Sequence, residues 1–113
     1  METIAVYTTV ASRDEARRMA RVLVERKLAA CAQISEIESF YTWEGVVQNS
    51  PEWRIVFKTT AARYGAVERD IRELHSYELP AIHAVAVANV FDPYAVWVGA
   101  ESTGNPAAGD EGD

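Results

Sequence analysis

The stretch from Ala29 to Thr60 constrains the fold of this chain more than any other segment. It contains two β-type runs that flank a turn region carrying Gly45, Asn49, Ser50 and Pro51. The first run, from Cys31 to Trp43, alternates between two faces: Ile37, Tyr41 and Trp43 on one, and Ile34, Phe40 and Thr42 on the other. A period of two predicts a strand. The run is about twice the mean strand length of roughly five to six residues, so we expect the hairpin to overhang its domain.

Aromatic residues are concentrated at the far end of this hairpin. Phe40, Tyr41 and Trp43 lie on the first run, and Trp53 lies across the turn. Exposed apolar patches on small proteins mark interaction sites. The projecting hairpin therefore predicts a partner, and the most economical partner is a second copy of the same chain.

The composition indicates a single domain. The chain has 113 residues, of which 49% are hydrophobic. That is enough to build a core without disulfides or a metal. We expect residues 1–100 to form this domain. Residues 101–113 are rich in Gly, Pro, Ala and Asp, and we expect them to form a disordered acidic tail.

Charge and cysteine usage exclude several classes of protein. The formal net charge is −6, and no basic stripe with interleaved aromatics is present, so nucleic acid is excluded as a partner. Cys31 is the single cysteine, which rules out an intrachain disulfide and favours a reducing compartment, the cytoplasm. No leader pattern is present and no apolar run approaches about 18 residues, so we expect neither secretion nor membrane insertion.

The order of the elements predicts an α+β fold of the ferredoxin-like type. We expect a strand over 3–9, and a helix that starts at Ser12 with Glu15 at the capping-box spacing and ends near Lys27. The hairpin follows, then a helix over 63–74, a strand over 81–90 and a short helix over 94–99. Asp92 and Pro93 fit the N-cap and first position of that last helix. The βαββαβ order predicts an antiparallel sheet with two helices on one face.

The last strand gives a second argument for assembly. It is apolar on both faces: Ile82, Ala84, Ala86 and Ala88 on one, and Val85, Val87 and Phe91 on the other. Such a strand is expected to be covered on both sides. Two helices cover only one face, so we expect the open face of the sheet to be buried against other subunits.

Three residues are candidate metal ligands: Cys31, His75 and His83. They show no paired spacing of the kind that structural zinc sites use. Cys31 is also explained as a small buried residue on a strand, and His83 as a hydrogen-bonded histidine of the sheet. His75 follows the second helix and could interact with its terminus. It is the best titratable candidate of the three.

Lys58 has two interpretations. Its ammonium contacts an anion in a cleft between subunits, with Glu44 or Glu52 nearby, or it is a solvated charge on a strand. We interpret the aromatic side chains of Tyr41, Trp43 and Trp53 as packing residues in preference to a platform on which a ligand stacks. No serine nucleophile motif, glycine-rich phosphate loop or HExxH is present, and no acid–base pair stands out. We therefore do not expect an enzyme.

The chain resembles the CutA divalent-cation tolerance proteins over residues 4–98. The motifs that carry the resemblance occur in the family's order. They are VYTT, Ser12–Arg13–Asp14–Glu15, Leu28–Ala29–Ala30–Cys31, Ser39–Phe40–Tyr41–Thr42–Trp43–Glu44–Gly45, Glu52, Lys58–Thr59, the segment with His75, Tyr77 and Pro80, and finally Tyr94 and Trp97. Three positions depart from the family pattern. Cys31 is followed by Ala-Gln instead of Val-Asn, Ser76 replaces a proline, and Ala81 replaces an acidic residue.

The resemblance implies a ferredoxin-like subunit in a homotrimer, with long strands that complete neighbouring sheets. It also implies a link to copper and other divalent metals, and a trimer similar to that of PII-type signalling proteins. The loss of a carboxylate at Ala81 removes one oxygen ligand that a metal site could use.

Three functional hypotheses remain open. The first is a homotrimeric metal-tolerance protein that binds copper or a similar divalent ion weakly through Cys31 with His75 or His83. The second is a PII-like trimer with a small ligand between subunits, near Tyr41, Trp43, Lys58 and Thr59. The third is a scaffold for an unknown protein partner. In each case the expected trimer interface contains Phe40, Tyr41, Trp43, Trp53 and Trp97.

Overall fold

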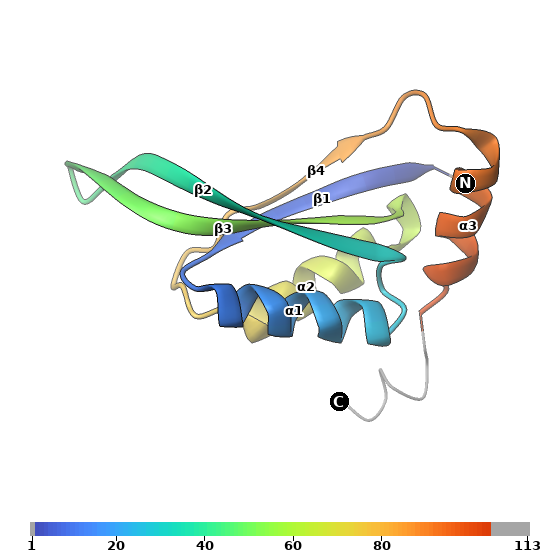
Figure 1. Cartoon of the computed structure of the whole chain (residues 1–113), viewed down its shortest axis with the longest axis horizontal. Helices are drawn as coiled ribbons and strands as arrows, with labels where there is room; N and C mark the ends of the chain where they lie inside the picture. The colour runs from blue at the N-terminus through green and yellow to red at the C-terminus, as the bar shows by residue number, and fades with distance from the viewer. Residues whose placement is uncertain (1, 105–113) are drawn as a thin grey trace.

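The computed structural model describes residues 2–104 and contains one four-stranded antiparallel sheet in the order β2-β3-β1-β4 (Figure 1). The elements along the chain are β1 (Thr3–Val10), α1 (Arg13–Glu25), β2 (Cys31–Trp43), β3 (Val46–Thr60), the 3-10 turn η1 (Ala61–Arg63), α2 (Tyr64–Leu74), β4 (Ile82–Ala86) and α3 (Asp92–Glu101). Helices α1 and α2 lie together on one face of the sheet, and α3 stands at one end (Figure 1). The predicted ferredoxin-like α+β fold is confirmed.

The core lies between the sheet and the pair α1 and α2. Alternate residues of the central strands face the helices, as the period of two requires. The cluster contains Ile4, Val6, Val10, Ala16, Met19, Leu23, Leu28, Ala29, Ile55, Phe57, Val67 and Ile71. Asp70 is also buried, and its carboxylate accepts a 2.8 Å hydrogen bond from Arg26 just beyond the end of α1. This ion pair joins the two helices.

The hairpin has the predicted first strand, and Gly45 lies in its turn as predicted, but the turn is shorter than expected. The turn is formed by Glu44 and Gly45, which have positive φ angles of 51° and 80°. Two consecutive positive φ angles match the twist of paired strands, as in a two-residue hairpin turn. The prediction that Asn49, Ser50 and Pro51 belong to the turn region is therefore wrong, because they lie within β3. Proline is tolerated there because β3 has a strand on one side only at that point.

The hairpin overhangs the sheet as predicted. β1 pairs with β3 from Thr3 opposite Thr60 to Val10 opposite Trp53. Beyond Trp53, residues 37–43 of β2 and 46–52 of β3 pair only with each other. We call residues 37–52 the arm, and it projects from the sheet in Figure 1. Trp53 is not on the arm, contrary to the prediction, and it packs half-buried against the core at the last pair with β1.

The segment after α2 differs from the prediction in three ways. β4 covers Ile82–Ala86 instead of 81–90. Among the described residues it pairs with β1, and this pairing reaches the start of β1 at Val87. Asp92 is the first residue of α3, and Phe91 occupies the N-cap. α3 continues to Glu101, and the buried Ser102 follows it. The described fold thus includes residues 101–104, whereas the rest of the predicted disordered tail, residues 105–113, lies outside the described residues.

Candidate functional site

The face of the sheet opposite α1 and α2 carries most of the candidate ligand residues. The strand register places Lys58 between Cys31 on β2 and Ala5 on β1, and it places Ala5 beside Val85 on β4. The Lys58 ammonium donates a 2.9 Å hydrogen bond to the side-chain oxygen of Gln33. We call this surface the open face. Because β4 is exposed from His83 to Ala86, much of this edge of the sheet is left uncovered by the described residues 2–104.

Cys31 lies where α3 meets the open face. It is half-buried, and its Sγ atom is 3.5 Å from the hydroxyl of Tyr94 on α3. Burial, together with the contact to Cys31, raises the pKa of Tyr94 to about 12. Tyr94 therefore stays neutral at physiological pH. Its ring also stacks on Trp97 with centroids 5.8 Å apart.

His83 and His75 occupy unlike environments. The ring of His83 stacks on Tyr7, its register partner on β1, at 5.0 Å and 5°. His75 has no exposed side-chain surface. Its Nε2 atom is 2.8 Å from the carbonyl oxygen of Thr9, which can only accept, so Nε2 carries the proton. Its Nδ1 atom accepts a 3.1 Å hydrogen bond from the backbone N–H of Tyr77. Both ring nitrogens of His75 are therefore used within the chain.

The three predicted metal ligands do not come together in one chain. Cys31 and His83 lie on the two outer strands of the sheet, three strand spacings and two residues of offset apart, which is about 16 Å. Within residues 2–104, no group of three or more His, Cys, Asp or Glu side chains is placed to hold a metal ion. The described residues of one subunit therefore do not fit a complete metal site.

The predicted ligand residues are also separated. Thr59 is buried, and its hydroxyl donates a 2.7 Å hydrogen bond to the carbonyl oxygen of Leu28. Lys58, its neighbour, points to the opposite face of the sheet, as successive strand residues do. Tyr41 and Trp43 are on the arm, and Tyr41 is about 26 Å along β2 from the Gln33 that binds Lys58. One chain cannot close a ligand site from these four residues.

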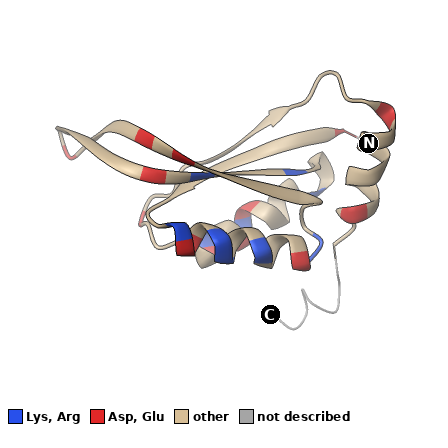
Figure 2. Ribbon diagram, viewed as in Figure 1, with Lys and Arg blue, Asp and Glu red and all other residues tan. Residues whose placement is uncertain are grey.

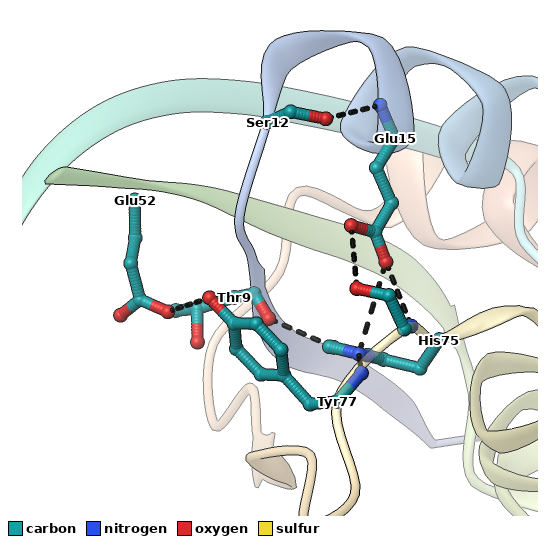
Figure 3. A network of polar contacts seen from close by, with 7 residues as sticks. Thr9, Ser12, Glu15, Glu52, His75 and Tyr77 are labelled. Atoms are coloured by element: carbon teal, nitrogen blue, oxygen red, sulfur yellow. Dashed lines mark hydrogen bonds and ion pairs between the residues drawn. The ribbon is translucent and has the colours of Figure 1, made fainter.

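A polar network at the base of the arm was not foreseen from the sequence. Glu52 is only 7% exposed, and its Oε2 atom accepts a 2.6 Å hydrogen bond from the hydroxyl of Tyr77 (Figure 3). Burial, followed by the bond to Glu52, raises the pKa of Tyr77 well above its ordinary value. Glu52 is thus engaged here and is not an acidic partner of Lys58. The sequence showed the segment of His75, Tyr77 and Pro80, but not its partner 25 residues earlier.

Ser76 and Glu15 complete this network. The predicted N-cap is confirmed, since the hydroxyl of Ser12 accepts the N–H of Glu15 at 3.1 Å. The carboxylate of Glu15, however, accepts two 2.9 Å hydrogen bonds from Ser76, one from its backbone N–H and one from its hydroxyl (Figure 3). Ser76 therefore supplies two donors that a proline at this position could not. A hollow of about 450 Å³ lies beside this loop, lined by Arg69, Arg72, Glu73, Tyr77, Glu78 and Pro80.

Charges are unevenly distributed over the surface. Figure 2 shows basic residues gathered along α1 and acidic residues along the hairpin. The arm also exposes large apolar side chains, with Phe40 at 70% and Val47 at 70%. An acidic arm with exposed aromatics is suited to protein contacts and not to phosphate backbones. No helix within residues 2–104 is long and apolar enough to span a bilayer.

Comparison with known proteins gives one consistent family. The model of the CutA1 divalent ion tolerance protein family matches residues 4–101. The divalent-cation tolerance protein CutA of Thermotoga maritima is 38% identical over 95 residues, which cover 84% of this chain and 94% of the relative. The protein of the same name from Thermococcus kodakarensis is 36% identical over 98 residues, which cover 87% and 94%. A solved structure, described as the periplasmic divalent cation tolerance protein CutA from Archaeoglobus fulgidus, superposes with a TM-score of 0.87 at 32% identity over 88% of this chain and 98% of that one.

Proposed function

Because this chain belongs to the CutA1 divalent ion tolerance family, we propose that it is a homotrimeric metal-tolerance protein that binds copper or a similar divalent cation. The observation that carries the assembly part is the arm. It exposes Phe40, Tyr41, Trp43, Val46 and Val47 beyond the end of β1. Apolar side chains gathered on a projecting ribbon are expected to be buried against another protein surface.

The open face and α3 support the same assembly. Phe91 is 75% exposed, and Val85, Val96 and Trp97 are also exposed in the single chain. A closed ring of identical subunits, in which each subunit contacts the next through two different surfaces, would bury such side chains on every copy. In this proposal the arm of one subunit lies across a neighbouring subunit, and Trp97 makes contacts at the edge of the same interface. Trp53 supports the arm from within its own subunit.

Metal binding requires residues from more than one subunit in this proposal. The family is described as one of divalent ion tolerance proteins. A thiolate together with imidazoles suits copper or zinc better than magnesium or calcium. Cys31 and His83 share the open face, whereas His75 has both ring nitrogens occupied. Cys31 and His83 are therefore the residues that would hold the ion, as ligands contributed by different subunits.

Calorimetric titration of copper tests this assignment. Cys31→Ala and His83→Ala should each weaken binding by about tenfold or more. His75→Asn, checked for folding by circular dichroism, should bind copper as the wild type does. Equal stoichiometry and affinity in the wild type and in Cys31→Ala would remove Cys31 from the site.

A second candidate is a PII-like trimer with a small anionic ligand between subunits. It is favoured by Lys58, whose ammonium lies on the open face beside Gln33. In the proposed trimer a neighbour's aromatic arm would cover this face. Small-ligand sites favour such clefts with few polar groups. A thermal-shift screen of nucleotides and organic anions discriminates between the two, since stabilisation that Lys58→Ala abolishes would favour this second function. In either case we propose a non-catalytic role and a reducing cytoplasmic location, in which Cys31 is not part of a disulfide.

A further inference from the structure

The root of the arm is a structural weak point. β3 is flanked by two strands as far as Trp53, and from Glu52 outward it pairs with β2 alone. A two-stranded ribbon without further support is marginally stable and twists readily. The arm therefore needs a contact that defines its direction relative to the sheet.

The hydrogen bond between Tyr77 and Glu52 is located at this root. Glu52 is the first residue of β3 beyond its last pair with β1, and its buried carboxylate accepts the Tyr77 hydroxyl at 2.6 Å. A buried carboxylate is costly unless it is hydrogen-bonded, and a short bond to an ionised acceptor is among the stronger ones. This contact resists any motion that would separate Glu52 from the loop.

Tyr77 is itself anchored to the body of the domain. Its N–H donates to His75, whose Nε2–H donates to Thr9 on β1. The rings of His75 and Tyr77 also lie 4.8 Å apart. The adjacent Ser76 donates twice to Glu15 on α1. Figure 3 shows these contacts as one connected chain from β1 and α1 to the root of the arm.

We propose that Tyr77 is a positioning residue for subunit assembly, which sets the direction of the arm by holding Glu52. This proposal rests on the proposed trimer, whose contacts the arm would make. A strand rises about 3.4 Å per residue, so the tip of the arm lies about 20 Å from Glu52, and a rotation of about 10° at the root moves the tip by about 3.5 Å. Such a displacement is enough to take an aromatic side chain out of a fitted pocket.

The test compares Tyr77→Phe with the wild type and with Tyr64→Phe. Tyr77→Phe removes only the hydroxyl. Tyr64 lies at the start of α2, and burial and the neighbouring Glu68 raise its pKa, so Tyr64→Phe removes a comparable hydroxyl away from the arm. The double variant Tyr77→Phe/Glu52→Gln also removes the carboxylate charge that would be left without its partner, in case the single variant does not fold.

Two readouts are measured on each protein: hydrogen exchange of the amides in residues 37–52, and the rate at which differently labelled oligomers exchange subunits. Tyr77→Phe should raise both rates by about tenfold, the effect of losing a hydrogen bond to a charged group. The double variant should do the same, and Tyr64→Phe should leave both rates unchanged. Unchanged rates in both Tyr77 variants would overturn the proposal. A monomeric wild-type protein would overturn the trimer and the assembly role together, while faster exchange in the arm would still establish the contact as the support of the arm.

Discussion

The Nε2 atom of His75 donates a 2.8 Å hydrogen bond to the carbonyl oxygen of Thr9, which joins the end of α2 to β1. The second ring nitrogen accepts from Tyr77, and the side chain has no exposed surface. Replacement by alanine should therefore leave a cavity and two unpaired backbone groups. We expect His75→Ala to lower the free energy of unfolding by about 2–4 kcal/mol, measured by urea denaturation.

His83 is the matched control for this change. Its ring stacks on Tyr7 on an exposed edge strand, so His83→Ala should cost less than about 1 kcal/mol in the isolated subunit. Equal losses in the two variants would show that the contacts of His75 contribute little to stability.

The ion pair of Arg26 with the buried Asp70 gives a second prediction. The side chain of Asp70 is 5% exposed, and its oxygens contact Arg26 at 2.8 Å and Arg69 at 3.1 Å. Arg26→Ala should lower the free energy of unfolding by about 1–3 kcal/mol, because it leaves a buried carboxylate with fewer partners.

Arg21 on α1 is the control, since it pairs with Glu25 at 3.6 Å on the exposed surface. Arg21→Ala should change the free energy of unfolding by less than about 0.5 kcal/mol, as exposed pairs usually do. Denaturant titration of the two variants side by side would contradict the account if Arg21→Ala were the more damaging.

Gly45 in the turn of the arm provides a third prediction. Its φ is +80°, and no atom lies within 4 Å of the position that a Cβ would take, so the cost of a side chain there is backbone strain alone. Gly45→Ala should destabilise the hairpin by about 1 kcal/mol.

Gly65 lies in α2, and a Cβ there also meets open space. Gly65→Ala should therefore stabilise the protein by about 0.5–1 kcal/mol, because alanine loses less backbone freedom in a helix. Thermal unfolding of both variants should move in opposite directions, and a rise in Tm for Gly45→Ala would be incompatible with the observed turn.

Much of this fold could be predicted from the local pattern of apolar and capping residues. The alternation from Cys31 to Trp43 predicted β2 with the correct ends, and Ser12 predicted the start of α1. The predicted turn region included Gly45 correctly, but its extension to Asn49, Ser50 and Pro51 was wrong. Residue type favoured a turn there, whereas the positive φ angles occur at Glu44 and Gly45. β4 is shorter than its apolar run because the run outlasts its partner strand.

The candidate site was less predictable because its contacts join distant residues. Glu15 fits a capping box, yet its carboxylate binds Ser76, 61 residues away. Glu52 was expected near Lys58, and only the folded loop brings Tyr77 to it. We predicted Cys31, His75 and His83 as one set of metal ligands from their side-chain chemistry. In the described part of the fold they lie on β2, after α2 and on β4, and do not come together. Local sequence carries no information on such distances.

Tyr94 gives a prediction on pH dependence. Its pKa is raised from 10.0 in a free side chain to about 12, by burial and by Cys31. A raised tyrosine pKa means that the folded state holds the proton more tightly than the unfolded state. The stabilisation is therefore complete below about pH 10 and is lost as pH rises towards about 12.

Alkaline titration followed by tyrosinate absorbance measures this directly. The wild type should show a late component near pH 12 that Tyr94→Phe lacks and that Cys31→Ala shifts to lower pH. Stability that fell less steeply between pH 10 and 12 in the wild type than in Tyr94→Phe would contradict the sign of the effect.

The central claim is that the arm assembles three copies of this chain. Multi-angle light scattering over a dilution series measures it most directly. The wild type should have three times the chain mass of 12.5 kDa, and Trp43→Ala should dissociate at higher protein concentration, because buried aromatic residues dominate interfaces. A folded wild-type protein with the mass of one chain at every concentration would contradict the account.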